Sequence, residues 1–196
     1  MKKSTIIWIA VAVVILGSFV WVKNVYNKLV SADENTQSMW SQVENVYQRR
    51  ADLIPNLVAT VKGYAAHESQ TLENVVAARA KATQVTVDPS DLTSESGEKF
   101  NEAQGELSTA LGRLLLIQEN YPDLKANENF RDLQAQLEGT ENRIATERMK
   151  FNQAVKEYNT NIRRFPSNII ASVFGFEQKG YFEAQAGSET APKVEF

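Results

Sequence analysis

The chain contains no cysteine and a single histidine, His67. The lack of cysteine excludes disulfide bonds, thiol nucleophiles and zinc sites built on thiolates. One histidine also excludes a di-iron helical bundle, which takes Glu-x-x-His from two helices. A Ser-His-Asp catalytic centre would depend on His67 alone, so composition disfavours many classes of enzyme.

Other features are scarce as well. Lys and Arg total 21 against 24 Asp and Glu, a formal net charge of −3, which gives no support for nucleic-acid binding. Five prolines and nine glycines are too few for a low-complexity chain. No stretch alternates apolar and polar residues for long, which argues against a sheet. A length of 196 residues predicts one domain of ordinary size.

What the chain does have is a long apolar run near its N-terminus. Residues 5–22 carry no charge and follow a short basic segment, residues 1–4. As a helix this run would be about 27 Å long, close to the thickness of the hydrocarbon core of a bilayer. A tryptophan lies near each end, as in the aromatic belts of membrane proteins. We therefore predict a transmembrane helix over residues 5–22.

A cleaved signal peptide is the alternative interpretation of this run. Its only small-residue cleavage site, Gly17–Ser18, is poor, and the apolar run continues past it to Val22. Lys2 and Lys3 favour a cytoplasmic N-terminus, although two lysines after the span favour the opposite orientation. We expect a single-pass cell-membrane protein whose remaining chain lies outside the cytoplasm.

Residues 23–176 carry apolar side chains at intervals of three and four, as helices packed along one face do. The first of these helices is expected to continue the span and to run to about residue 81. Pro55 lacks the backbone donor for the carbonyl of Ala51, so a kink is expected there.

Capping and breaking residues set the other boundaries. Asn127 and Ser167 are expected N-caps, and Pro122 is expected to stop the preceding helix. The predicted fold class is all-α: an N-terminal transmembrane helix and then an antiparallel bundle of three long helices. The expected elements after the first helix are a loop over residues 83–97, helices over residues 98–120, 127–164 and 168–174, and an extended tail over residues 177–196.

Several motifs are distinctive, above all RRADLIPNLV at residues 49–58 and LEGTENRIA at residues 137–145. Others are YNKLV at residues 26–30, YPDLKA at residues 121–126 and YNTNI at residues 158–162. In these motifs the chain resembles the LemA family over nearly its whole length. Phe151 departs from the family pattern, which usually has tyrosine there, so the ring is kept and a hydroxyl is lost.

The resemblance implies a single-span membrane protein with a helical bundle and no established biochemical activity. It supplies no catalytic residues and no cofactor. A relative acts in magnetosome biogenesis, which implies a role in membrane organisation. Members are often encoded near membrane proteins with a TPM domain, which implies a protein partner.

Charged residues beside Pro55 and on the last long helix form a candidate site. Arginine pairs bidentately with carboxylates, so an ion-pair network inside the bundle is the favoured interpretation, and contact with a partner is the alternative. The residues of this charged patch are Arg49, Arg50, Asp52, Glu138, Glu141 and Arg148, with Glu147 nearby.

Other polar residues are weaker candidates. Glu141 and Glu147 with Glu44 or Glu68 lack the histidines of a metal site, so no metal is expected. His67 and Glu68 are adjacent and would not face each other on a helix, so an acid–base pair is not expected. Four asparagines are predicted to form hydrogen bonds between helices and fix their register, or else to form a polar recognition ladder. They are Asn27, Asn152, Asn159 and Asn161.

Two apolar features lie near the C-terminus. One is a cluster that either folds back on the bundle, which is favoured, or stays exposed as a contact for another subunit or the membrane. Its members are Ile169, Ile170, Val173, Phe174 and Phe176. The other is the end of the tail, where Val194 and Phe196 are expected to dock on the chain's own bundle rather than add as a strand to a PDZ-type domain.

The sequence thus predicts a non-enzymatic, membrane-anchored scaffold or adaptor of the cell envelope. Its partners would be the membrane, through the span, and either a protein or further copies of itself. No cofactor, nucleic acid or small-molecule substrate is expected. The alternatives are a carboxylate-dependent envelope hydrolase using Glu68, Glu141 or Glu147, and a membrane-shaping protein.

Overall fold

The structure, a computed structural model, describes residues 3–90 and 92–183. Their regular elements are all helical, which confirms the all-α prediction. The elements are α1 (Lys3–Tyr64), α2 (Ser69–Gln84), α3 (Ser94–Leu116), the 3₁₀ helix η1 (Ile117–Asn120), α4 (Pro122–Ala126), α5 (Glu128–Arg163) and α6 (Ser167–Val173).

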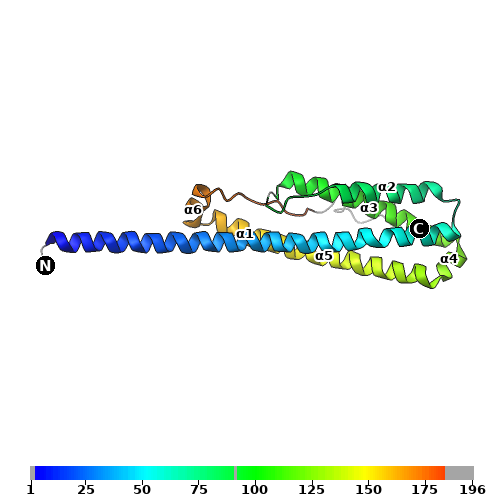
Figure 1. Cartoon of the computed structure of the whole chain (residues 1–196), viewed down its shortest axis with the longest axis horizontal. Coiled ribbons are helices and arrows are strands. Elements are labelled where there is room, and N and C mark those ends of the chain that lie inside the picture. Colours follow the sequence, from blue (N-terminus) through cyan, green and yellow to red (C-terminus); the bar gives the residue numbers. More distant parts are fainter. Residues whose placement is uncertain (1–2, 91, 184–196) are drawn as a thin grey trace, which may run out of the picture.

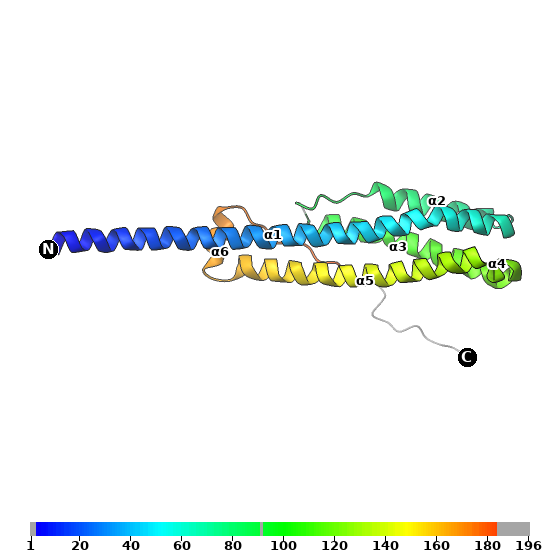
Figure 2. The same cartoon turned by 60° about the horizontal axis from the view of Figure 1, so that its bottom comes forward.

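The helices form an elongated antiparallel bundle around the C-terminal part of α1. Figure 1 shows α2, α3 and α5 running alongside this part, with α4 at the far tip. The N-terminal part of α1 extends alone beyond the bundle, and α6 lies against α1 near the place where the bundle ends. The view of Figure 2 shows the same arrangement.

The projecting part of α1 carries the predicted span. Among the described residues, α1 is the one helix long and apolar enough to cross a membrane. Its large side chains are exposed, with Trp8 71% and Phe19 67% accessible. Exposed apolar side chains along the helix are what the predicted span would present to lipid.

The first helix of the bundle ends earlier than the sequence predicts. α1 stops at Tyr64, and a turn over residues 65–68 leads into α2, so the expected helix to about residue 81 is wrong. Reversing the chain here packs Leu72 and Val75 into the same core cluster as Leu57. A straight helix would have carried this apolar stripe past the end of its partners. The bundle therefore has four long helices rather than three.

Two capping predictions have different outcomes. Asn127 is the N-cap of α5, as predicted, and its Oδ1 accepts a hydrogen bond from the backbone N–H of Phe130 at 2.9 Å. Ser167 is inside α6, which has Pro166 at its N-cap position and no side-chain cap, so this prediction is wrong. α3 begins at Ser94, before the expected residue 98, because Thr93 caps it in a capping box.

Pro55 lies inside α1 without ending it. Proline has no backbone N–H, so the carbonyl four residues earlier, that of Ala51, loses its helical donor. Arg79 of α2 supplies the replacement, because its Nε donates to the Ala51 oxygen at 2.7 Å. The proline thus leaves the Ala51 carbonyl free to accept a hydrogen bond from α2, which joins α2 to α1.

This contact predicts an energetic coupling between Pro55 and Arg79. Arg79→Ala should lower the free energy of unfolding by about 1–2 kcal/mol, because a partly buried carbonyl loses its donor. In a Pro55→Ala background, residue 55 regains its own N–H for that carbonyl, so Arg79→Ala should cost less than half as much. Urea unfolding of the two single variants and the double variant measures this coupling. Simple additivity would contradict it.

Among the described residues, the core consists of three clusters along the bundle. The distal core, farthest from the projecting end of α1, includes Leu57, Leu114 and Phe130. The central core includes Trp40, Phe100, Phe151 and Phe182. The proximal core joins α1, α5 and α6 through Leu29, Tyr158, Ile162, Ile170 and Ala171.

Candidate functional site

The most concentrated polar site surrounds the guanidinium of Arg50, which is only 1% exposed. Its Nη1 donates to Ser108 Oγ at 2.7 Å and to Glu141 Oε1 at 2.8 Å. Its Nη2 donates to the side-chain oxygen of Gln104 at 2.6 Å and to the backbone oxygen of that residue at 3.3 Å. The guanidinium carbon lies 5.0 Å from the centre of the Tyr47 ring. One cation therefore joins α1, α3 and α5.

The network extends to the remaining long helix. The Gln104 side-chain amide donates to the backbone oxygen of Ala82 at 3.2 Å, at the end of α2. Arginine keeps its charge at every accessible pH, and the carboxylate of Glu141 neutralises it across the bundle. Glu141 itself is 46% exposed, so its carboxylate remains partly hydrated. The arrangement fixes the register of all four long helices.

The ion pair that the structure forms within the charged patch joins Arg50 to Glu141. Asp52 and Glu138 accept hydrogen bonds within their own helices, from Gln48 at 2.7 Å and Gln134 at 3.1 Å. Arg49 is exposed on α1, on a different side from its buried neighbour. Arg148 donates to the backbone oxygen of Glu183 at 3.0 Å, and its guanidinium carbon lies 4.7 Å from the centre of the Phe182 ring.

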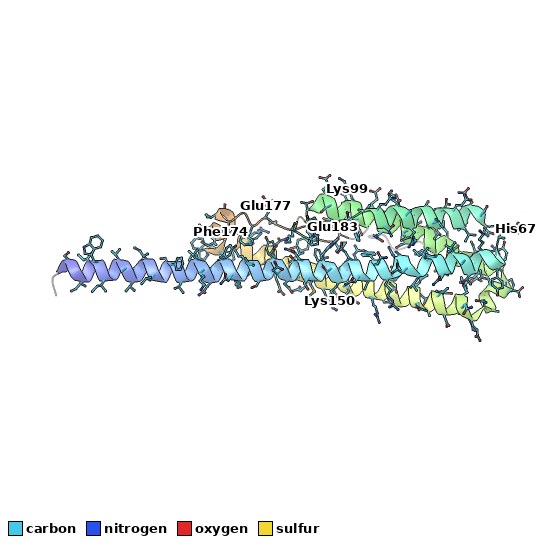
Figure 3. The ribbon with its side chains drawn as sticks, viewed as in Figure 1. His67, Lys99, Lys150, Phe174, Glu177 and Glu183 are labelled. Carbon is cyan, nitrogen blue, oxygen red and sulfur yellow. The ribbon has the colours of Figure 1, made fainter. Side chains whose placement is uncertain are left out.

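The carboxylates that sequence analysis considered for catalysis or metal binding have separate partners. Tyr121 donates to Glu68 at 3.3 Å, and Lys150 donates to Glu147 at 2.9 Å. His67 is exposed at the distal tip of the bundle, as Figure 3 shows. Within residues 3–90 and 92–183, no three His, Cys, Asp or Glu residues are grouped as metal ligands would be.

The segment over residues 177–183, here called the strap, runs back along the bundle after α6 (Figure 1). Two asparagines of α5 hold its backbone. Asn159 donates to the Lys179 oxygen and accepts from the Lys179 N–H, both at 2.9 Å. Asn152 does the same with Phe182, at 2.9 and 2.8 Å. The prediction that these asparagines bond between helices is therefore wrong.

The spacing of the two asparagines matches the strap. Asn152 and Asn159 are two helical turns apart, a rise of about 10.5 Å. Lys179 and Phe182 are three residues apart in extended chain, about 10 Å. Because the distances agree, each amide faces a strap residue without stretching either element. Sequence reasoning identified these asparagines but missed the strap, whose residues carry no periodic pattern.

Two strap side chains are buried in the bundle. Lys179 is 7% exposed, and its Nζ pairs with Asp33 of α1 at 3.0 Å. The Phe182 ring stacks on Trp40, with centroids 5.4 Å apart and planes at 13°. The strap therefore connects α5 to the central core and to α1.

The ring centre of Tyr158 lies 5.5 Å from Nζ of Lys179 in the strap, and the surroundings of the Tyr158 hydroxyl disfavour its ionisation. Burial raises the pKa of its hydroxyl to about 12, and the negative charges of Asp33 and Glu177 act in the same direction. A tyrosine in an unfolded chain ionises near pH 10. Between about pH 10 and pH 12 the unfolded chain thus binds fewer protons than the folded one, and stability falls as pH rises.

Tyr158→Phe should therefore reduce the loss of stability at alkaline pH. Below about pH 10 the variant should show no pH dependence different from that of the unaltered chain, since the phenol is protonated in both states. Between about pH 10 and pH 12 its urea midpoint should fall less steeply. Parallel curves across this range would contradict the assignment, and Tyr181→Phe, at an exposed tyrosine of the strap, is the matched control.

The apolar cluster near the C-terminus is divided between two environments. Ile170 is buried at 7% exposure in the proximal core, and Phe176 packs against it. Ile169, Val173 and Phe174 are 53%, 73% and 52% exposed. The cluster thus folds back through part of its surface and leaves the rest uncovered. Val194 and Phe196, the expected tail docking residues, lie outside the described residues.

A shallow apolar groove lies near the distal tip, between α1 and α2. It has a volume of about 410 Å³ and is lined by Val58, Leu72, Val76 and Ala80, with Lys62 and Glu73 among its polar residues. Val76 is 52% exposed there. The groove is open on the surface of the rod.

The sequence of the chain is similar to those of known proteins. The model of the LemA family matches residues 39–196. Magnetosome protein MamQ 2 of Paramagnetospirillum magneticum is 29% identical over 182 residues, covering 84% of this chain and 67% of the relative. Magnetosome protein MamQ of Magnetospirillum gryphiswaldense is 28% identical over the same coverage. Protein LemA of Metamycoplasma hominis is 22% identical over 158 residues, covering 81% and 68%. Because the family model matches most of its residues, this chain belongs to the LemA family.

Proposed function

We propose that this membrane-associated protein is a helical scaffold or adaptor of the cell envelope, which acts through protein contacts or self-assembly and catalyses no reaction. The observation that carries the proposal is the continuity of α1. One helix contains the apolar run and the central element of the bundle. The proposed anchor and the central helix of the bundle are therefore parts of one continuous helix.

This continuity sets how the bundle is presented. Residues 23–64 of α1 rise about 60 Å beyond the apolar run, at about 1.5 Å per residue. The Arg50 network and the strap hold the other helices against this rod. A rigid bundle of this length keeps its tip, with the apolar groove, at a fixed height above the membrane. That geometry suits a protein that positions others.

The proposed orientation places the N-terminus in the cytoplasm and the bundle outside it. Lys2 and Lys3 precede the span directly and support this topology through the excess of basic residues on cytoplasmic sides. Relatives named as magnetosome proteins agree with a role at a membrane.

The test is the mass and composition of the native complex. The full chain would be extracted from its own membranes in polymer-bounded lipid discs and analysed by native mass spectrometry. We expect several copies of the chain, or the chain with another envelope protein. A monomer alone would overturn the proposal.

A matched pair of variants tests the role of rigid α1. Asn24 is exposed and lies just beyond the apolar run. Asn24→Pro removes a helical hydrogen bond at the junction of span and bundle, whereas Asn24→Ala keeps the helix. The assembly should weaken with proline and persist with alanine, with both variants recovered in the membrane fraction. Equal assembly in both would show that continuity of α1 is not required.

A further inference from the structure

α6 lies where the span leaves the bundle. Its buried residue Ile170 belongs to the proximal core with Leu29, and Val22, the last residue of the apolar run, packs against the same core. The Phe174 ring, just after α6, is 4.8 Å from the ring of Tyr26. Tyr26 is about 6 Å along α1 from Val22. Figure 3 shows Phe174 beside α1 at the membrane-proximal end of the bundle.

The outer side of this region is uncovered and apolar. Phe165, Ile169 and Val173 are 76%, 53% and 73% exposed and follow one another at intervals of four residues. Ile169 and Val173, four residues apart, therefore lie on one exposed face of α6, next to the buried Ile170 rather than opposite it, and Phe165 precedes them. Large exposed apolar residues that gather on one side are typical of a contact surface.

Exposed basic residues lie on the two helices that pack against α6, although the whole chain is acidic. Lys23 and Lys28 are exposed on α1, and Arg163 and Arg164 are exposed at the end of α5, directly before α6. The nearby carboxylates are Asp33, which is paired with Lys179, and the exposed Glu34 and Glu177. A net charge of −3 for the chain hides this local excess of positive charge. Clusters of Lys and Arg beside a span attract anionic lipids.

We propose that α6 and Phe165 form an interfacial membrane contact. The face of Phe165, Ile169 and Val173 enters the boundary between headgroups and acyl chains, and the four basic residues contact the phosphates of anionic phospholipids. The occupant is the bilayer because the face is continuous with the end of the span. The inference depends on insertion of α1 but not on the scaffold role. This contact attaches the bundle to the membrane at a second place and so fixes the tilt of the bundle relative to the membrane.

Spin labels test this contact in the full chain, which has no native cysteine. Val173→Cys would carry a nitroxide on the proposed contact, and the chain would be reconstituted in vesicles of phosphatidylcholine and phosphatidylglycerol. Leu116→Cys, at a distal residue of similar exposure (68%), is the matched control. Phe19→Cys reports insertion of the span. Collisions with oxygen and with a water-soluble nickel chelate are compared at each label.

We expect the labels at positions 19 and 173 to favour oxygen and the label at position 116 to favour nickel. Equal nickel access at positions 173 and 116 would overturn the inference. Protection of position 173 from both reagents would also overturn it, in favour of a contact with another protein. A label at position 19 that favours nickel would instead show that the span is not inserted, which would overturn the proposed function as well.

The charge contribution has its own test. Replacing Arg163 and Arg164 together by glutamine should lower the oxygen preference at position 173 in vesicles containing phosphatidylglycerol. It should change nothing in phosphatidylcholine alone, because neutral lipids offer no net charge. Arg143→Gln, at an exposed residue of α5 toward the distal end, is the control. Equal effects in both lipids would overturn the role of the basic residues.

Discussion

Arg50→Ala is expected to lower the free energy of unfolding by about 4 kcal/mol, among the largest effects of any single substitution in the bundle. The change removes a side chain that is 1% exposed, leaving a cavity between α1, α3 and α5. It also leaves the side-chain oxygen of Gln104 without its 2.6 Å donor. A buried acceptor without a partner costs about 1–3 kcal/mol, and the cavity adds to that cost.

Two further substitutions distinguish the loss of the buried arginine from the general effect of mutation on stability. Arg49→Ala should stay within about 0.5 kcal/mol, since Arg49 is exposed on the same helix turn. Arg50→Met should cost less than Arg50→Ala, because methionine fills most of the cavity without a charge. Thermal melts of the full chain in detergent would measure the order, at about 2–4 °C per kcal/mol. Equal melting temperatures for Arg49→Ala and Arg50→Ala would contradict the structural role of the network.

Loss of the counter-charge should also be costly, for a different reason. Glu141→Gln leaves a cation that cannot be deprotonated buried among neutral partners, so we expect a loss of about 2 kcal/mol. The loss is smaller than for Arg50→Ala because Gln104 and Ser108 still accept hydrogen bonds from the guanidinium. Arg50→Ala should thus cost more than Glu141→Gln because it also removes the contacts with Gln104 and Ser108.

The sequence predicts most of the helices because their stabilising signals are local. Asn127 caps α5, and intervals of three and four mark the core positions of α1, α3 and α5. The turn over residues 65–68 has no such signal. The pattern continues in phase across it, from Leu57 through Val61 to Leu72 and Val75, because both helices face the same core. Only tertiary packing decides that the chain reverses there.

The polar contacts were less predictable than the helices. Arginine and glutamate on separate helices were an expected pair, but sequence alone offered six candidates, and the structure joins Arg50 to Glu141. Asn152 and Asn159 were two of four asparagines predicted to bond between helices. Their partners are backbone groups of the strap. Because every residue type carries these groups, the sequence does not indicate which of them would be bound. The Arg79 contact is similar, since its acceptor exists because Pro55 lacks an N–H.

Replacing Asn152 and Asn159 together by alanine is expected to release the strap from the bundle while the four long helices remain folded. The double change removes four hydrogen bonds to the backbone of Lys179 and Phe182. At about 1 kcal/mol each, they favour the docked strap by about 4 kcal/mol. Proteolysis of a locally opened segment follows the population of the open form, so cleavage by trypsin after Lys179 should rise at least about 100-fold.

The readout distinguishes release of the strap from unfolding of the bundle. Lys179 is only 7% exposed in the docked strap, whereas Lys99 on α3 is exposed in either case, so cleavage after Lys99 serves as the internal reference. In a chain carrying Trp8→Phe and Trp21→Phe, emission from Trp40 should shift to the red, because Phe182 no longer stacks on it. Gln153→Ala, at an exposed residue between the two asparagines, should change neither signal. Unchanged cleavage after Lys179 in the double variant would show that other contacts of the strap, such as the buried side chains of Lys179 and Phe182 and the bond from Arg148 to Glu183, hold it rather than the asparagine amides.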